Sequence, residues 1–183
     1  QHLRNLGNGQ IRASAISGDG SATGGLAQGS SSRTPAYWNP DTTGSMLDFN
    51  ALGEVNGFTE DGSTSVGTYY FGSSNFLSAY VRDAASGVLT NLGALNPATM
   101  SGIATDISED LDTVVGYDSI QLSREAWVWT SADGIISLQD RLGALGIAGV
   151  PTIYTCAAVS DDGNVIVGSS APGFNTGYIA NLD

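Results

Sequence analysis

The chain has 183 residues, which is enough for one domain with its own core, and its 41% hydrophobic fraction argues against a disordered chain. Eighteen acidic residues stand against six basic ones, all of them Arg, and the net charge is -12. This charge disfavours nucleic acids and anionic membrane surfaces as partners, because the chain has no basic footprint that could displace counterions from phosphates. The 25 glycines favour many short strands joined by tight turns.

Two residue types common in active sites occur once each. His2 lies at the start of the chain, and Cys156 lies in the apolar run 153–159, where we expect a buried structural thiol. The sequence therefore predicts no Cys/His pair, no His-based triad and no disulfide framework. The chain begins with Gln1, as a processed product or an excised segment would. No apolar run reaches the roughly 18 residues of a membrane-spanning helix, so no membrane insertion is expected.

Taken in chain order, a strand–turn–strand pattern occurs four times, over residues 13–25, 57–67, 103–116 and 157–168. A Ser/Thr-x-Asp-Gly turn marks its centre, with the aspartates at Asp19, Asp61, Asp110 and Asp162. The Asp and Ser side chains can cap backbone N–H groups, while Gly takes the positive φ that reverses the chain. The third turn has Leu111 in the glycine position, so its geometry is expected to differ or to be strained. A Val-Gly pair ends most of the second strands and predicts a bend or a close backbone approach.

Each turn motif is followed by a strand with aromatic residues and then by a segment that ends in Leu-Gly. We divide the single domain, 1–183, into repeat units at approximately 11–53, 54–95, 102–145 and 155–182, with 3–7 assigned to the last unit. A short helix is expected near 138–145. Ser137 and Asp140 resemble a capping box, Leu138, Leu142 and Leu145 share one helical face, and Gly146 can end the turn.

The period of roughly 42 to 52 residues, with three or four strands per unit, predicts an all-β, β-propeller-like repeat domain of about four blades. The fourth unit lacks a Leu-Gly strand, while residues 3–7 supply an extra one at the start. Pairing of 3–7 beside 178–182 would close the ring. The alternative is an arc of a larger ring.

The motif A-x-x-I-S-x-D-G-x-x-x-V-G, followed by an aromatic strand and G-x-x-x-x-L-G, resembles the bacterial extracellular HAF repeat. That repeat occurs in secreted proteins and in some autotransporter passengers. The matches lie at 15–20 with 36–38, 61–67 with 79–81, 107–116 with 126–129, and 159–168. Gly177-Tyr178-Ile179 departs from the pattern in the last unit. The resemblance implies an exported, non-enzymatic surface module, with no catalytic residues to carry over.

Three groups of residues are candidate sites. Asp106, Ser108, Asp110 and Asp112 place oxygen atoms at alternate positions of the 106–112 turn, a candidate for Ca²⁺, although no cofactor is otherwise expected. The acid pairs Glu60/Asp61, Glu109/Asp110 and Asp161/Asp162 could suggest a glycosidase, but neighbouring residues in a turn point in different directions. One aromatic position per blade could stack on sugars or pack between blades. Its residues are Trp38, Tyr80, Trp127, Trp129 and Tyr178.

The favoured hypothesis is a secreted or cell-surface β-repeat module with a structural, adhesive or self-assembling role and no enzymatic activity. Its partners would be other copies of itself or another surface protein, and Tyr69-Tyr70-Phe71 with Gly72-Ser73-Ser74 is a candidate self-association patch. The alternatives are a carbohydrate-binding propeller and, less favoured, a glycoside hydrolase.

Overall fold

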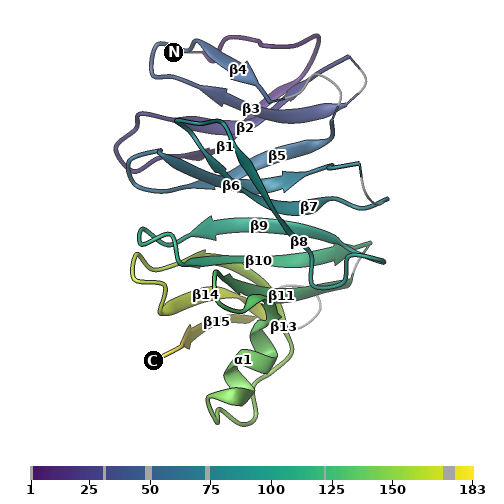
Figure 1. Cartoon of the computed structure of the whole chain (residues 1–183), viewed down its shortest axis with the longest axis vertical. Coiled ribbons are helices and arrows are strands. Elements are labelled where there is room, and N and C mark those ends of the chain that lie inside the picture. The colour runs from purple at the N-terminus through teal and green to yellow at the C-terminus, as the bar shows by residue number, and fades with distance from the viewer. Residues whose placement is uncertain (1, 31, 48–50, 73–74, 122, 171–175) are drawn as a thin grey trace.

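A computed structural model describes residues 2–30, 32–47, 51–72, 75–121, 123–170 and 176–183, which form fifteen strands and one short helix. The strands make four antiparallel sheets, each a meander in sequence order. The sheets stack face to face along the long axis of the molecule in chain order (Figure 1). We call them blades 1 to 4. The all-β, blade-like repeat predicted from the sequence is confirmed.

Blades 1 to 3 have four strands each and blade 4 has three. Blade 1 contains β1 (Ile11–Ile16), β2 (Thr23–Gln28), β3 (Arg33–Trp38) and β4 (Gly44–Met46). Blade 2 contains β5 (Gly53–Phe58), β6 (Thr64–Tyr69), β7 (Ser78–Asp83) and β8 (Leu89–Gly93). Blade 3 contains β9 (Ser101–Ile107), β10 (Thr113–Ile120), β11 (Ser123–Thr130) and β12 (Gly134–Ser137). Blade 4 contains β13 (Ile153–Val159), β14 (Val165–Ser170) and β15 (Thr176–Asn181), and α1 (Leu138–Ala144) lies between β12 and β13.

The hydrophobic core lies mainly between the blades. Val66 of blade 2 packs with Ala104 and Trp127 of blade 3, and Val128 of blade 3 packs with Ile153 and Ile166 of blade 4. Each blade therefore buries its apolar residues against its neighbours, as repeat architectures do.

One glycine in the second strand of each blade permits a close backbone approach. A Cβ atom on Gly25, Gly67, Gly116 or Gly168 would lie 1.9 to 2.1 Å from a carbonyl oxygen of the first strand. Any side chain there would force the two strands apart. The close approach predicted from the Val-Gly pairs is confirmed.

The four turns share one geometry. In each, a Ser or Thr hydroxyl donates to the Asp carboxylate two residues later, as Ser17 does to Asp19 at 2.8 Å and Ser108 to Asp110 at 2.5 Å. Leu111 has a φ of 64°, close to the 68° of Gly62 in the equivalent position. The turn of blade 3 therefore keeps the repeat's shape and carries the strain of a left-handed leucine.

The helix agrees with the prediction only in part. Leu138 and Leu142 are buried, but Leu145 is 43% exposed because it lies past the end of α1. Ser137 makes no side-chain capping hydrogen bond, so the predicted capping box is absent. Gly146 has a φ of 79° and ends the turn as expected. None of the helices in the described ranges has the length and apolarity needed to span a bilayer.

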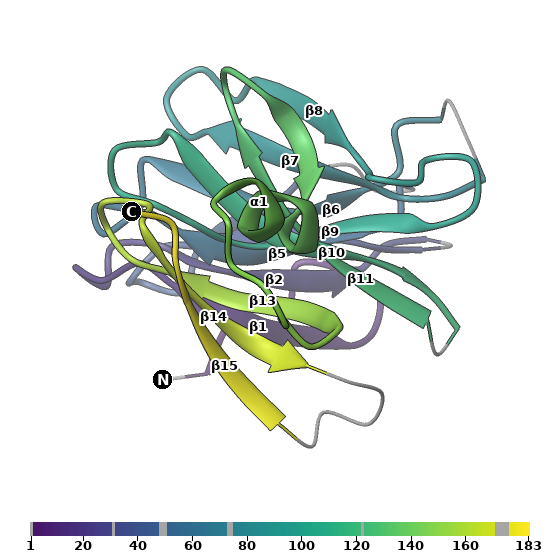
Figure 2. The same cartoon turned by 90° about the horizontal axis from the view of Figure 1, so that it is seen from below.

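The predicted closure of the ring is wrong. Residues 3–7 form no strand, and the two chain ends lie at opposite ends of the long axis (Figure 1). Viewed from below, blade 4 and α1 form the near end of the stack (Figure 2). In the described residues β15 pairs only with β14, so the start of the chain does not complete the sheet of blade 4. The described residues form an open arc.

Candidate functional site

A β-bulge in the first strand of every blade builds a common groove. The pairing register shifts once in each of β1, β5 and β9 and twice in β13, and each shift leaves one residue of the first strand unpaired. Bulges change the direction in which a side chain points, and here they bring four equivalent residues to one surface. These residues are Ser14, Asn56, Thr105 and Ala157, and all of them line an open groove of about 570 Å³.

The charges in the groove differ from those of the chain as a whole. Arg12 donates to Glu54, with Nη2 and Oε2 2.5 Å apart, and Ser14 donates to the other oxygen of the same carboxylate. Glu54 is the only carboxylate among the described residues that line the groove, while Arg124 is a second guanidinium. The Arg124 guanidinium lies 4.8 Å from the centre of the Tyr117 ring. The groove therefore carries a positive excess within a chain of net charge -12.

Hydrogen bonds between blades hold the floor of the groove. Asn56 Nδ2 donates to the carbonyl of Ala104 at 2.8 Å, and Thr105 Oγ1 donates to the carbonyl of Cys156 at 3.0 Å. These bonds join the first strands of blades 2, 3 and 4. They hold these three strands together along the groove.

Cys156 adjoins the groove but does not present a reactive thiol. Its side chain is 1% exposed, and its Sγ donates to the carbonyl of Trp127 at 3.6 Å. Burial raises the pKa of this thiol to about 12, although a hydrogen bond from Tyr178 lowers it in part. The expected buried structural thiol is confirmed.

The aromatic residues fall into two rows rather than one. Tyr80, Trp127 and Tyr178 lie opposite the close-approach glycines of blades 2 to 4, whereas Ala36 takes that position in blade 1. Trp38 is equivalent to Trp129 instead. The first three aromatics in chain order, Trp38, Tyr80 and Trp127, are at most 1% exposed. Their ring faces are unavailable for stacking on sugars, and Trp127 packs between blades 2 and 3, which is the other role expected for it. The predicted single aromatic position per blade is wrong, because the strand pairing places Trp38 two residues past it.

The 106–112 turn does not gather its oxygen atoms. Asp106 accepts from the backbone N–H of Val159 at 2.9 Å, Asp110 accepts from Ser108, and Asp112 accepts from Ser131 Oγ at 2.8 Å. In the part of the chain that the structure describes, no group of three or more His, Cys, Asp or Glu side chains is placed to hold a metal ion.

The acid pairs of the turns connect successive blades. The backbone N–H of Asp19 donates to the carbonyl of Glu60 at 2.9 Å, and that of Glu60 donates to Glu109 Oε1 at 2.5 Å. The backbone N–H of Glu109 donates in turn to the carbonyl of Asp161 at 3.0 Å. This ladder of turns has a structural role that the sequence did not reveal, since it depends on how the blades stack.

The aromatic run that begins with the last residue of β6 is partly exposed. The rings of Tyr69 and Phe71 pack edge to face with their centres 5.1 Å apart, and Tyr70 is 39% exposed. Gly72 belongs to the described chain, but Ser73 and Ser74 lie outside the described residues. Self-association through this patch stays a prediction.

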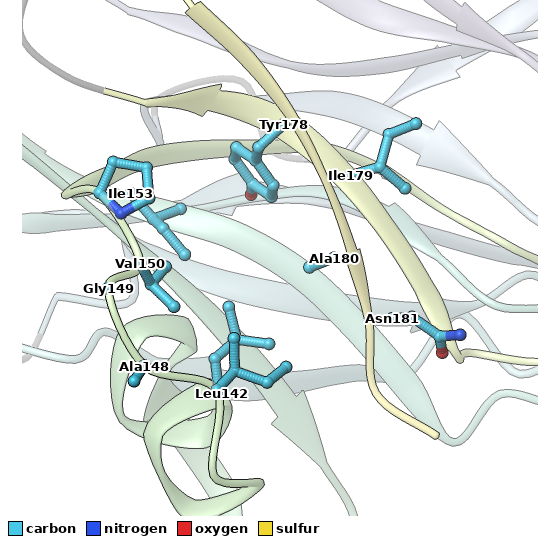
Figure 3. Close-up of a pocket in the computed structure, with 11 residues that line it drawn as sticks. Leu142, Ala148, Gly149, Val150, Ile153, Tyr178, Ile179, Ala180 and Asn181 are labelled. Atoms are coloured by element: carbon cyan, nitrogen blue, oxygen red, sulfur yellow. The ribbon is translucent and has the colours of Figure 1, made fainter.

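A second cavity, which the site predictions from the sequence missed, lies at the open end of the stack. It has a volume of about 350 Å³ and lies between β15 and the segment that connects α1 to β13 (Figure 3). Its lining is largely apolar and includes Leu142, Val150, Ile153 and Ile179. The missing Leu-Gly strand of the fourth unit was the sequence signal for this feature.

Repeated four-stranded blades stacked around a shared groove define a β-propeller-type fold. The solved structures that are similar to the chain include two TolB-type proteins. A TolB-type protein from Agrobacterium tumefaciens matches with 17% identity and a TM-score of 0.59, over 87% of this chain and 55% of that one. TolB from Acinetobacter baumannii matches with 13% identity and a TM-score of 0.59, over 93% of this chain and 43% of that one. The chain thus spans about half the length of these proteins, and the similarity establishes the fold alone.

No family model and no curated protein matches the chain. The resemblance to HAF repeats therefore stays a prediction from the motifs.

Proposed function

We propose that this chain is a non-enzymatic interaction module of an extracellular or cell-surface protein, with a structural or adhesive role, and that it holds a partner protein in the groove. The observation that carries the proposal is the set of four equivalent bulges, which present Ser14, Asn56, Thr105 and Ala157 on one surface. The extracellular location rests on the resemblance to HAF repeats.

The charges of the groove favour a partner segment with an acidic side chain. Arg12 has a side chain that is 58% exposed although it pairs with Glu54, so it can still contact a ligand. Arg124 adds a second positive charge, and Asn56 and Thr105 line the same groove. A volume of about 570 Å³ accommodates a few side chains of an extended peptide.

Panning of a random peptide library on the folded chain tests this proposal. Ala157 is exposed in the groove, so Ala157→Trp should fill the groove without disturbing the core. The matched control is Ala85→Trp, at an exposed position of the turn between β7 and β8. We expect acidic peptides that bind the wild type and Ala85→Trp but at least tenfold more weakly to Ala157→Trp.

Two results would contradict the proposal. One is peptide binding that Ala157→Trp leaves unchanged. The other is a screen that yields no binding peptide, together with specific binding of the chain to a glycan array. That result would favour the carbohydrate-binding alternative.

A further inference from the structure

A small cavity opens beside the groove, between blades 1 and 2. It has a volume of about 160 Å³, and we call it the side pocket. Arg12, Glu54 and Thr68 line both the side pocket and the groove. The side pocket is therefore continuous with the groove, and a ligand that lies in the groove can reach into it.

The side pocket has an apolar wall of three leucines. Leu26 belongs to β2, Leu52 directly precedes β5, and Leu77 directly precedes β7. Leu26 is only 5% exposed and forms a fixed floor, whereas Leu52 is 46% exposed and offers apolar area that a ligand can bury. The volume is below the roughly 300 Å³ of a pocket for a drug-sized molecule, so the side pocket suits a single side chain.

Two arginines lie in the same pocket. Arg12 keeps 58% of its side chain exposed, and Arg33 is exposed at the first position of β3. With Arg124, three of the six arginines of the chain line the two connected cavities. Glu54 is the only carboxylate among the described residues that line either cavity. An acidic ligand is therefore attracted to a place where an apolar side chain can also be buried.

The pairing of β1 with β2 sets the spacing between the charge and the apolar wall. Arg12 lies opposite Leu26 in this antiparallel pair. Residues opposite each other point to the same face of the sheet, and their Cα atoms are about 5 Å apart. An extended peptide rises about 3.3 Å per residue, so two of its side chains that lie within two positions of each other span this distance.

We propose that the side pocket is a specificity subsite, which holds an apolar side chain of the partner segment next to the acidic side chain that Arg12 and Arg33 attract. This inference rests on the proposed function, because it names the sequence that the groove selects: Leu, Ile, Val or Met within two positions of Asp or Glu. A purely acidic segment would leave Leu52 exposed. A purely apolar segment would gain nothing from the two arginines.

A double-mutant cycle between the chain and a selected peptide tests the subsite. An acidic peptide from the panning experiment, and the same peptide with its apolar residue replaced by Ala, are each titrated against the wild type and Leu52→Ala. Each change alone should weaken binding about fivefold, and both together should weaken it little more than either one. The matched control is Leu145→Ala, which shortens a leucine that is 43% exposed at the end of α1 and should bind like the wild type.

A charge reversal tests the acidic half of the motif independently of the leucines. Arg33→Glu should weaken binding of the acidic peptide by about fivefold or more, because it places a carboxylate beside that of the ligand. Arg4→Glu changes the net charge of the chain by the same amount at an exposed position outside both cavities, so it should leave the affinity unchanged.

The outcomes separate the subsite from the groove. Selected acidic peptides without an apolar residue near the acid, or effects in the cycle that simply add, would overturn the subsite and leave the groove in place. Equal binding to Arg33→Glu and Arg4→Glu would also overturn it. Failure to select acidic peptides, or binding that Ala157→Trp leaves unchanged, would overturn the proposed function and the subsite with it.

Discussion

Blades 2 and 4 are built from equivalent residues but differ in their surroundings. Each has an aromatic residue over a close-approach glycine, Tyr80 over Gly67 and Tyr178 over Gly168. Tyr80 is fully buried, whereas Tyr178 is only partly buried, because in the described chain no fourth strand flanks β15. The comparison shows that a neighbour, rather than the repeat motif itself, decides how much each position contributes to stability.

The largest expected effect is that of filling the close approach in blade 2. A Cβ atom on Gly67 would lie 2.0 Å from the carbonyl oxygen of Glu54, between strands that are held on both sides. We expect Gly67→Ala to lower the free energy of unfolding, measured by urea denaturation, by about 3 kcal/mol or more. Gly168→Ala should cost less, because no strand lies beyond β15 in the described chain and β14 and β15 can move together away from β13.

Gly143→Ala is the matched control for both glycine variants. Gly143 lies in α1 with open space around its Cβ position, so the alanine should stabilise the helix by about 0.5 kcal/mol or more. Equal losses in Gly67→Ala and Gly168→Ala would show that the free edge does not relax.

The second prediction compares a charge at two equivalent positions, each of which follows the residue opposite the close-approach glycine of its blade. Val81→Asp puts a carboxylate into the cluster between blades 2 and 3, and we expect a loss of about 2 kcal/mol or more. Ile179→Asp puts the same carboxylate on an exposed face, and its effect on stability should stay within about 0.5 kcal/mol. Thermal unfolding of the dilute proteins measures both. A large loss in Ile179→Asp would mean that this face of blade 4 is covered in solution.

The third prediction compares the turns of blades 3 and 4, which have a leucine and a glycine at the same left-handed position. Leu111 holds a φ of 64° where Gly163 of blade 4 holds 75°. Leu111→Gly should therefore relieve the strain of a left-handed leucine and raise the free energy of unfolding by about 1 kcal/mol. Gly163→Ala should have the opposite sign, because it introduces that strain into blade 4. A destabilising Leu111→Gly would show that the leucine side chain contributes more than its backbone costs.

The smallest expected effect is a dependence of stability on acid. The backbone N–H of Ser63, and then the hydroxyls of Ser63 and Thr59, hold the pKa of Asp61 below its ordinary value. The stabilisation from this carboxylate is present above the unfolded-state pKa and is lost as the pH falls through the lower folded-state pKa. Asp106 acts in the opposite direction, because burial raises its pKa and protonation then favours the folded state.

Asp61→Asn should make the acid-induced loss of stability below about pH 4 less steep in urea melts across pH. Asp183→Asn removes one acidic charge at the exposed end of the chain and serves as the control. If the stability of Asp61→Asn depends on pH in the same way as that of the wild type, the Asp61 carboxylate does not contribute to the acid sensitivity of the fold.

The sequence predicts the features that a single turn or strand determines. The Ser-x-Asp-Gly turns, the close-approach glycines and the helix after Ser137 could all be found, because each depends on local backbone geometry. The groove could not, since Ser14 and Thr105 reach it through bulges that only the pairing register defines. Ring closure was predicted wrongly because sequence motifs give the number of blades but not the rotation between them.

The position of Trp38 shows a similar limit. Its sequence context resembles that of Tyr80, but the strand pairing places Ala36 opposite the close-approach glycine of blade 1. The spacing of the aromatic residues in the sequence alone could not show that Trp38 lies two residues past the position that Tyr80 occupies in its blade.

A distance measurement between the chain ends tests the open arc most directly. The chain with Arg4→Cys and Asp183→Cys can be spin-labelled at these two exposed sites. Dilution with an excess of unlabelled chain ensures that double electron–electron resonance reports only distances within one molecule. We expect only long distances, because blades 2 and 3 separate the two ends. A dominant short distance, as between strands about 5 Å apart in one sheet, would contradict the open arc and restore the closed ring.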